Sequence, residues 1–504
     1  MKQLYITTAI PYVNATPHIG NALDYLIADI WTRYQKQNGN QVRFQVGTDE
    51  HGNKIAAKAG EAGLHPQAYT DKMYINFENV IKKVGAEYTD FIRTTSPHHQ
   101  QAVQYIWQKL QPYIYKGTYE GWYCQGCEAF VTDKEATLNN GTCPDHNQPY
   151  QKLSEENYYF KASAFTQQVR EAIDKRKFEI VPAFRKHEFL ELIKDGIKDI
   201  SISRPKKNLS WGVPVPNDPN QIMYVWIDAL ANYITVLGYP DNEEWKNYWP
   251  ADIQVLGKDI LRFHAGIWPP ILLALGLPLP KKLLVHGHIS SSGTKMSKSL
   301  GNVVDPNEII DQYGVDAFRY YFSRHIPTLD DGDFSWEKFE MAYNNELGNE
   351  LGNLVQRIAA MINRYQSGVI GDVPQPEHDV RIYHDHMKAL EFNRAFDEIW
   401  HKVRALNSYI EDVKPWQIAK DSETSPEAKE HLEEVLAYMA GSIVQIGDLL
   451  VPFLPTTAAA IHAIFTTGVV KLPDTGPLFP KLYLKTPDPR GTNVTSSHSQ
   501  EAAG

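Results

Sequence analysis

Two polar motifs that lie far apart in the sequence contain the residue types that bind a nucleoside triphosphate. Residues 17–21 (PHIGN) place His18 and the small Gly20 where an apolar run turns into a helical pattern. A later polar loop (SGTKMSKS) carries Lys295 and Lys298. A helix N-terminus favours anions, and lysines on a loop can reach the same phosphates. Taken singly, His18 could cap a helix and the loop could be a solvated basic turn. Together, in this order, they indicate a nucleotide site.

A second group of residues has the spacing of metal ligands. Cys124-x2-Cys127 is followed after fifteen residues by Cys143-x2-His146, and the group contains all 3 cysteines of the chain. Three thiolates and one imidazole complete the tetrahedron that zinc prefers, and four protein ligands leave no position for a reactive water. The spacing therefore predicts one structural Zn²⁺. A catalytic zinc is the weaker alternative, and another thiophilic ion would fit the same ligands.

The elements around the nucleotide motif follow a strand–helix–strand order. Residues 3–10 are an apolar run typical of a buried strand, apolar residues then recur at helical spacing from Ile19 to Tyr34, and 42–46 alternate as a second strand. This order predicts a parallel sheet, with His18 at its carboxyl edge, where nucleotides bind.

Two later apolar strands extend this pattern. Residues 253–256 lead into Gly257-Lys258-Asp259, and residues 283–285 lead into His286-Gly287-His288. We therefore expect the second half of the same α/β domain here. The stretch between the halves, roughly 116–203, is predicted to be an insertion that holds the cysteines.

Composition limits the class of protein. A chain of 504 residues that is 42% hydrophobic and 22% charged fits a globular protein of two to four domains. Its net charge of −10 counts mildly against a nucleic-acid binder, so an RNA partner would have to meet local basic or aromatic patches. The scarcity of cysteine, the lack of a secretory signal and the prolines within the apolar stretch 449–470 predict a cytoplasmic protein without a membrane span.

Long helical patterns dominate from about residue 339. They cover 339–365, 380–412 and 426–451, and predict an α-helical bundle, followed by a disordered tail at 485–504. A period-four repeat puts Asn345, Asn349, Asn353 and Arg357 on one helix face. Such side chains can read the edges of unstacked bases, but a face of Asn and Gly could equally be a close helix–helix seam.

The motifs resemble those of a known family. His18-Ile19-Gly20-Asn21 together with Lys295-Met296-Ser297-Lys298-Ser299 is similar to the signature pair of class I aminoacyl-tRNA synthetases. Within that class, residues 9–12 (AIPY), 47–52 (GTDEHG) and 224–229 (YVWIDA) resemble the methionyl-tRNA synthetases. The resemblance runs from residue 4 to about 450. The family usually has a second histidine where this chain has Asn21; asparagine can still donate a hydrogen bond, although the phosphate contact can differ.

The resemblance implies a Rossmann catalytic domain that activates L-methionine with ATP and Mg²⁺ and loads it onto tRNA(Met). It implies catalysis by positioning and charge stabilisation, without a covalent enzyme intermediate. The residues that it assigns to catalysis are His18, Lys295 and Lys298. The residues that it assigns to ATP are His18, Gly20, Asn21, Gly257, Lys258, Asp259 and Lys298.

The resemblance also assigns residues to the amino acid and to the anticodon. Asp49 would pair with the methionine ammonium group, and an aromatic pocket would hold the thioether, because sulfur and aromatic rings attract one another. Without the resemblance, Trp226 and Tyr233 would be read as core packing and Asp49 as a turn acid. The implied methionine residues are Ile10, Tyr12, Asp49, Trp226, Ala229, Tyr233 and His264, and the implied anticodon residues are Asn353, Arg357 and Trp416.

We therefore expect an α/β Rossmann-type parallel-sheet domain with a zinc-knuckle insertion and a C-terminal α-helical bundle. The expected boundaries are 1–115 and 204–284 for the two catalytic halves, 116–203 for the insertion, 285–338 for a linking region, 339–484 for the anticodon domain and 485–504 for the tail. We expect a monomer. One alternative is a synthetase for another apolar amino acid, although an insertion of this size is small for an editing domain. The other is a non-catalytic, zinc-containing RNA-binding protein with the same fold.

Overall fold

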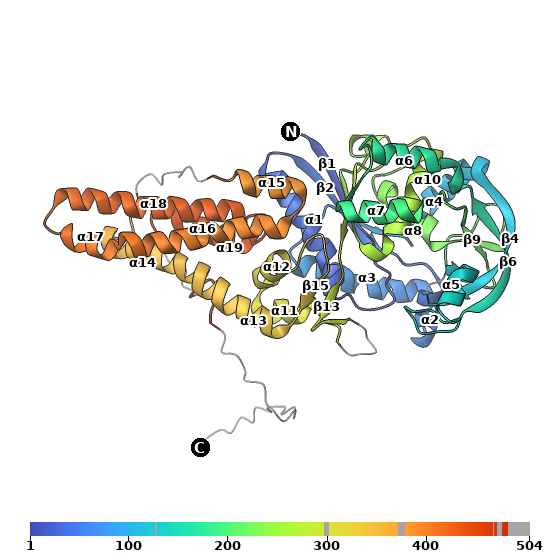
Figure 1. The fold of residues 1–504 in the computed structure, drawn as a ribbon, viewed down its shortest axis with the longest axis horizontal. Coiled ribbons are helices and arrows are strands. Elements are labelled where there is room, and N and C mark those ends of the chain that lie inside the picture. Colours follow the sequence, from blue (N-terminus) through green and yellow to red (C-terminus); the bar gives the residue numbers. More distant parts are fainter. Residues whose placement is uncertain (127–128, 297–301, 371–378, 467, 471–475, 482–504) are drawn as a thin grey trace, which may run out of the picture.

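The computed structural model describes residues 1–126, 129–296, 302–370, 379–466, 468–470 and 476–481. The molecule is elongated, with an α/β part at one end and a helical bundle at the other (Figure 1). None of the helices in these described ranges combines the length and apolar character that a bilayer crossing requires.

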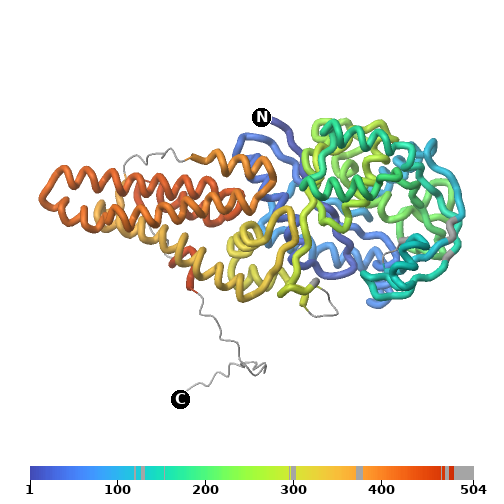
Figure 2. The backbone as a smooth tube through the Cα atoms, in the orientation of Figure 1, coloured from blue at the N-terminus to red at the C-terminus, as the bar shows by residue number. Residues whose placement is uncertain are grey.

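A six-stranded parallel sheet forms the centre of the α/β part. Its strands lie in the order β3-β2-β1-β11-β12-β7. They are β1 (Gln3–Thr8), β2 (Gln41–Thr48), β3 (Asp90–Arg93), β7 (Glu179–Val181), β11 (Ile253–Gly257) and β12 (Lys282–His286). The central pairing joins distant parts of the chain, since Ile6 lies opposite Ile253. Figure 2 shows the N-terminal and the later segment running side by side. This confirms the predicted parallel α/β class.

Successive residues of the strands pack on opposite faces of this sheet. Tyr5, Leu283 and Val285 belong to one buried cluster, whereas Ile6 and Leu284 belong to the other. Because both faces are covered, most residues of the central strands are buried, as expected for a parallel sheet. The helices of this part are α1 (Ile19–Gln37), α2 (Asn53–Glu61), α3 (Pro66–Lys83), α4 (Pro97–Leu110), α6 (Thr166–Asp174), α7 (Ala183–Leu192), α8 (Val225–Thr235), α9 (Leu261–Gly266) and α10 (Trp268–Ala274).

The predicted insertion is built around a second, antiparallel sheet in the order β5-β4-β6-β8. Its elements are β4 (Ile114–Cys124), β5 (Ala129–Val131), α5 (Asp133–Leu138), β6 (Gln151–Phe160) and β8 (Ile200–Ser201), followed by the pair β9 (Ser203–Pro205) and β10 (Gln221–Met223). The same stretch also contains β7, which pairs with β12 in the main sheet. The insertion thus supplies an edge strand to the domain that it interrupts.

A linking region connects the sheet to the bundle. It contains β13 (Ile289–Ser291), β14 (Thr294–Lys295), α11 (Pro306–Tyr313), α12 (Val315–Arg324) and β15 (Gly332–Phe334). The bundle follows with α13 (Trp336–Ala342), η6 (Tyr343–Gly352), α14 (Asn353–Gln366), α15 (Arg381–Ala389), α16 (Phe392–Val413), α17 (Pro415–Asp421), α18 (Pro426–Leu450) and α19 (Pro455–Phe465).

The bundle differs from the predicted helices at two places. The stretch 380–412 breaks at Leu390, which adopts a left-handed backbone with φ of 63°. The period-four repeat forms a π-helix, η6, whose hydrogen bonds span five residues. Its leucines, Leu347 and Leu351, are buried, whereas the amide side chains face outward. The tail at 485–504 lies outside the described residues.

Candidate active site

His18 lies at the start of α1, at the carboxyl edge of the sheet. Its Nδ1 accepts a hydrogen bond of 3.0 Å from the Gly20 N–H, and the Asn21 side-chain oxygen accepts one of 3.1 Å from the His18 N–H. The two residues thus form a reciprocal capping box. The capping interpretation of His18 is therefore correct as far as it goes, and it does not exclude a chemical role.

This cap determines which atoms face a ligand. In the neutral imidazole only one nitrogen carries hydrogen, so an Nδ1 that accepts a bond leaves Nε2–H as the donor. The first three N–H groups of α1 bond to Val304 O, His18 Nδ1 and His18 O. Since these backbone donors are engaged, an anion at this edge would have to be bound mainly by side chains, such as the predicted ATP residues His18 and Asn21.

The lysine loop is anchored to the same helix. The Val304 carbonyl, six residues beyond Lys298, accepts a hydrogen bond of 3.2 Å from the Ile19 N–H. The other side of the loop leaves the sheet edge through β13 and β14, which follow β12. Lys295 lies on β14, and Lys298 lies outside the described residues, so neither side chain has a described position. The segment that follows the lysine loop thus meets the end of α1 that carries His18.

The predicted ATP residues 257–259 lie at the end of β11, beside β1. A Cβ at Gly257 would lie 2.9 Å from an Asp259 carboxylate oxygen, so any other residue here would displace that carboxylate. The Lys258 ammonium contacts the Asp331 carboxylate at 2.6 Å, and Asp259 contacts His288 at 3.3 Å. Lys258 is thus directed toward the linking region.

Sequence reasoning gave no role to His286, which lies at the end of β12. Its Nε2 is 2.7 Å from a carboxylate oxygen of Asp24 on α1. Burial lowers the pKa of His286, but the neighbouring Asp24 carboxylate outweighs this and raises it above its ordinary value. The pair ties α1, the helix that follows His18, to the end of β12. In the sequence, the only indication of a role for His286 is its position in the His-Gly-His segment that follows a strand.

The predicted ammonium partner Asp49 continues the sheet beyond β2. Its N–H donates to the Pro11 carbonyl at 2.9 Å, and its carbonyl accepts from the Val13 N–H at 3.2 Å. Tyr12 and Asp49 consequently form a parallel bridge. Asp49 is only 6% exposed, so its carboxylate is held in a low-dielectric surrounding. Two distant stretches of the chain, near Ile10 and near Asp49, are therefore brought together as the resemblance implies.

Three of the predicted thioether residues, Trp226, Tyr233 and His264, contact one another in one aromatic group. The Tyr233 hydroxyl lies 2.7 Å from His264 Nε2, and His264 Nδ1 lies 3.0 Å from the Ile260 carbonyl. Nδ1 must donate to that carbonyl, so Nε2 accepts from Tyr233 and the ring is neutral. Burial agrees, since it lowers the pKa of His264 to about 4. Trp226 stacks on Phe263 at 3.8 Å and meets the His264 ring edge-on at 6.1 Å.

A buried His–Asp–His cluster behind this group was not foreseen. His51 Nδ1 lies 2.6 Å and His99 Nε2 lies 2.8 Å from the two carboxylate oxygens of Asp228. Burial by itself raises the pKa of Asp228. The two neighbouring histidines outweigh this effect and lower the pKa to about 2. Asp228 directly precedes the predicted pocket residue Ala229, and His51 follows Asp49 by two positions. The cluster therefore holds the two walls of the predicted pocket together.

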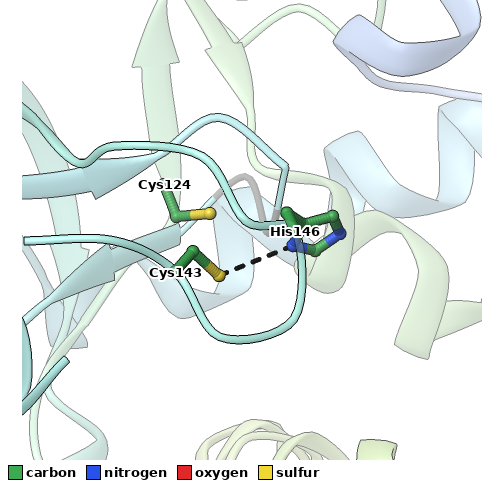
Figure 3. Close-up of side chains that lie close together, drawn as sticks. All are labelled: Cys124, Cys143 and His146. Carbon is green, nitrogen blue, oxygen red and sulfur yellow. Dashed lines mark hydrogen bonds between the residues drawn. The ribbon is translucent and has the colours of Figure 1, made fainter.

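The predicted metal ligands come together in the insertion (Figure 3). Ligand atoms of Cys124, Cys143 and His146 all lie within 4.8 Å of one another, and Cys143 Sγ is 3.6 Å from His146 Nδ1. Burial raises the pKa of the Cys143 thiol, but hydrogen bonds with His146 and Cys124 lower it to about 6, toward the thiolate that zinc binds. A Cβ at Gly126 would lie 2.3 Å from the His146 ring, so the turn needs glycine. Cys127 lies outside the described residues.

The predicted anticodon residues lie on neighbouring helices of the bundle. Asn353 is exposed at the start of α14, and Arg357, one turn on, is half-buried and contacts Glu411 at 2.6 Å. Trp416 is half-buried on α17, which packs on α14. The repeat does not form the alternative, a close helix–helix seam along its Asn face. Asn345, Asn349 and Asn353 are all exposed, and the leucines of the repeat pack inward.

Comparison with known proteins identifies a family and relatives that this chain resembles. The family model described as "tRNA synthetases class I (M)" matches residues 4–153 and 145–359. A methionine–tRNA ligase of Caldanaerobacter subterraneus is 43% identical over 474 residues, which are 90% of this chain and 73% of that protein. One of Thermotoga maritima is 38% identical over 475 residues, 91% of this chain and 74% of the relative.

Solved structures agree with these relatives. The methionyl-tRNA synthetase of Mycobacterium tuberculosis in complex with methionyl-adenylate superposes with a TM-score of 0.87 at 33% identity, over 95% of this chain and 100% of that one. Its apo form gives 0.81 at 30% identity, over 96% and 99% of the two chains. With this fold, this sheet edge and these relatives, the chain belongs to the methionyl branch of the class I aminoacyl-tRNA synthetase family.

Proposed function

We propose that the chain activates L-methionine with ATP and transfers the methionyl group to tRNA(Met). In the first step a methionine carboxylate oxygen attacks the α-phosphate of Mg·ATP, and pyrophosphate leaves. In the second, a hydroxyl of the terminal ribose attacks the carboxyl carbon, the anhydride bond breaks, AMP leaves and the hydroxyl proton passes to solvent. The supporting observation is the Ile19–Val304 hydrogen bond, which joins the end of the lysine loop to the His18 helix.

Positioned side chains stabilise the charge that moves during the first step. The His18 Nε2–H, the Asn21 amide and the ammonium groups of Lys295 and Lys298 face the phosphates, and the backbone at Gly20 and Gly257 allows close approach. Donors aimed at developing charge are worth roughly 3–4 kcal/mol each in comparable enzymes. Lys258 and Asp259 contribute from the opposite side of the nucleotide, with Lys258 released from Asp331.

Methionine is recognised by charge at one end and by shape at the other. The Asp49 carboxylate pairs with the ammonium group, beside the Ile10 backbone. The thioether packs among Tyr12, Trp226 and Ala229, with the Tyr233–His264 pair at the closed end. Because His264 is neutral and its Nε2 already accepts from Tyr233, this end of the pocket offers no charge. An apolar, polarisable side chain therefore suits it better than a polar one of the same length.

The remaining parts support the transfer step. Cys124, Cys143, His146 and Cys127 fit one structural zinc, which when bound would lock the tip of the insertion. Asn353, Arg357 and Trp416 read the anticodon of tRNA(Met) at the far end of the molecule. We propose that the domains follow the predicted ranges, with 1–115 and 204–284 forming the catalytic domain. The insertion is 116–203, the linking region is 285–338 and the anticodon domain is 339–484. We also propose that the protein is a cytoplasmic monomer.

Pyrophosphate exchange tests this function directly. ATP–pyrophosphate exchange measured with each of the twenty amino acids should respond substantially to methionine alone. Lys298→Ala should lose most of that exchange, about a hundredfold. Lys175→Ala, which changes an exposed lysine directly after α6, should retain it. Exchange without any amino-acid dependence, or an unaffected Lys298→Ala, would remove the proposed mechanism. A non-catalytic RNA-binding protein would show no exchange at all.

A further inference from the structure

Trp211 contacts the segment 49–52, which carries the predicted ammonium partner, although it is not itself among the predicted site residues. It lies after β9, where the chain leads from the insertion back toward α8. The Trp211 indole N–H donates a hydrogen bond of 2.7 Å to the Glu50 carbonyl. The Trp211 carbonyl accepts one of 3.0 Å from the Gly52 N–H. Trp211 therefore bonds to the main chain of this segment on both sides of His51.

The ring of Trp211 packs against residues that precede and follow this segment in the sequence. It meets the His51 ring and the His65 ring edge-on, with centroids 5.4 Å and 5.6 Å away. Together with Tyr12, a predicted methionine residue, it packs on a small buried apolar cluster. This cluster consists of Val13, Ile55 and Phe77. The Trp211 side chain thus has two separable parts, a ring that packs on the cluster and an N–H that holds the main chain.

The two polar side chains between these main-chain bonds are held by other elements. The fully buried Glu50 carboxylate pairs with Arg93 of β3 at 2.8 Å. His51 Nδ1 lies 2.6 Å from the Asp228 carboxylate of α8. These contacts fix the far ends of the side chains, whereas the bonds from Trp211 act on the peptide groups themselves. Trp211 therefore contributes a restraint that neither ion pair supplies.

The position of the Asp49 carboxylate depends on such main-chain bonds. The Asp49 N–H and carbonyl pair with main-chain groups of residues 11–13, and the Glu50 N–H donates to Thr94 Oγ1 at 2.9 Å. The bonds of Trp211 continue this series on the C-terminal side. Because an aspartate side chain has only two rotatable bonds, a shift of the main chain moves its carboxylate almost as far. A group displaced in this way pairs less well with a bound ligand.

We propose that Trp211 is a positioning residue for methionine binding, which holds the Asp49 carboxylate where it pairs with the substrate ammonium group. The proposal rests on the proposed function, because Asp49 has that partner only if methionine is the substrate. Trp211 acts through the Glu50 carbonyl and does not touch the substrate. The ammonium group stays paired before and during adenylate formation, so a displaced Asp49 weakens both states equally. Loss of the indole bond therefore raises the KM for methionine and leaves kcat unchanged.

Steady-state ATP–pyrophosphate exchange tests this role in Trp211→Phe, which keeps an aromatic ring and removes the N–H donor. The KM for methionine should rise about five- to tenfold, the effect of one lost hydrogen bond, with kcat and the KM for ATP unchanged. Trp211→Leu, which also removes the ring, should raise the methionine KM further. Trp336→Phe is the matched control, because Trp336 is also half-buried and meets two rings, Phe334 and Phe339, edge-on. It should leave both KM values unchanged. Urea unfolding of each variant verifies that it is folded.

L-Methioninol identifies the contact that is lost, because this alcohol has the ammonium group and the thioether of methionine but no carboxylate. Its inhibition constant against methionine should rise in Trp211→Phe by the same factor as the methionine KM, since both depend on the pairing with Asp49. An unchanged methionine KM in Trp211→Phe overturns the proposal. An unchanged inhibition constant for L-methioninol, or an equal rise in the KM for ATP, overturns it as well. Wild type without methionine-dependent exchange would instead refute the proposed function itself.

Discussion

The orientation of a single imidazole at residue 18 depends on the absence of a side chain two positions later. The His18 ring folds back over Gly20 to cap α1, and a Cβ at Gly20 would lie 2.7 Å from the ring Cε1 and 2.9 Å from Nδ1. Separations this short are repulsive, and here they involve a ring held in place by its own hydrogen bond. Glycine is thus required by the histidine and not by the backbone conformation.

We therefore expect Gly20→Ala to displace His18 and to reduce methionine-dependent pyrophosphate exchange about a hundredfold, as loss of one preorganised donor does. Loss of the cap should also lower the free energy of unfolding by about 1 kcal/mol. Gly60→Ala is the control, because nothing lies within 4 Å of a Cβ at this position of α2. It should leave exchange unchanged and slightly increase stability. Normal exchange in Gly20→Ala would contradict this view of the cap.

His264 should make stability depend on pH. Burial lowers its pKa from 6.5 to about 4, so the folded protein holds the ring neutral while the unfolded chain would protonate it. The stabilisation is complete above the ordinary pKa and is lost as the pH falls toward the lowered one. Between about pH 7.5 and about pH 5, wild type should lose about 2 kcal/mol more than His264→Gln, measured by urea unfolding. Parallel losses in the two proteins would show that another group dominates.

Prediction of single site residues succeeded where the residue type alone indicates the chemistry. The cysteine spacing led to Cys124, Cys143 and His146, which do lie together. Sequence-based prediction missed His99, because its hydrogen-bond partner Asp228 is 129 positions away. Nothing in the local pattern around a buried histidine tells which distant carboxylate it will meet.

At the scale of elements, α1 links the carboxyl edge of the parallel sheet to the bundle. Asp29, in its middle, is fully buried and contacts Arg319 of α12 at 2.7 Å. The same guanidinium donates to the carbonyls of Phe453 at 2.6 Å and Pro452 at 2.8 Å, between α18 and α19. A single buried cation thus joins α1, the linking region and the bundle.

Removal of this cation should be costly. Arg319→Leu leaves the Asp29 carboxylate short of one partner and several buried carbonyls without a donor, so we expect a loss of about 3–5 kcal/mol in the free energy of unfolding. Arg381→Leu breaks the Arg381–Asp379 pair, also 2.7 Å long, but its side chain is 86% exposed. That variant should be indistinguishable from wild type in chemical unfolding. Equal stability of the two variants would refute the joining role of Arg319.

Helices and strands were predictable where the spacing of apolar residues agrees with the positions of proline and glycine. The strand at 3–10, the helix that begins at Ile19 and the strand at 42–46 all formed close to the expected places, since proline, glycine and apolar spacing point the same way. The π-helix at Tyr343–Gly352 could not be foreseen, because a period of four fits an α-helix almost as well. The break at Leu390 was equally hidden, since leucine rarely adopts a left-handed backbone.

At the scale of the whole molecule, the insertion has two unequal parts, since residues such as Phe160, Phe165 and Phe189 belong to the large core of the α/β part. Its metal-binding end has a small core of its own, Cys124, Ala136, Cys143 and Tyr150. Because such a core is small for a sheet, we expect a bound ion to contribute much of the order there.

Metal analysis should find one zinc per chain. Chelation, or Cys143→Ser, should expose 116–160 to limited proteolysis before the α/β core is cut, and added zinc should restore protection to the chelated wild type. Cleavage that begins in the core, or protein that is fully protected without metal, would contradict a structural role for the ion.

The interleaved sheet also constrains how the chain is made. β1 is central, yet one of its two neighbours, β11, begins only at Ile253. A nascent chain that has emerged from the ribosome as far as 250 has an open, apolar strand edge at its most N-terminal element, and such edges invite pairing with other chains. Closing so long a loop is also slow. Cells that synthesise this protein quickly therefore need to shield its first forty-eight residues until half of the chain has been translated.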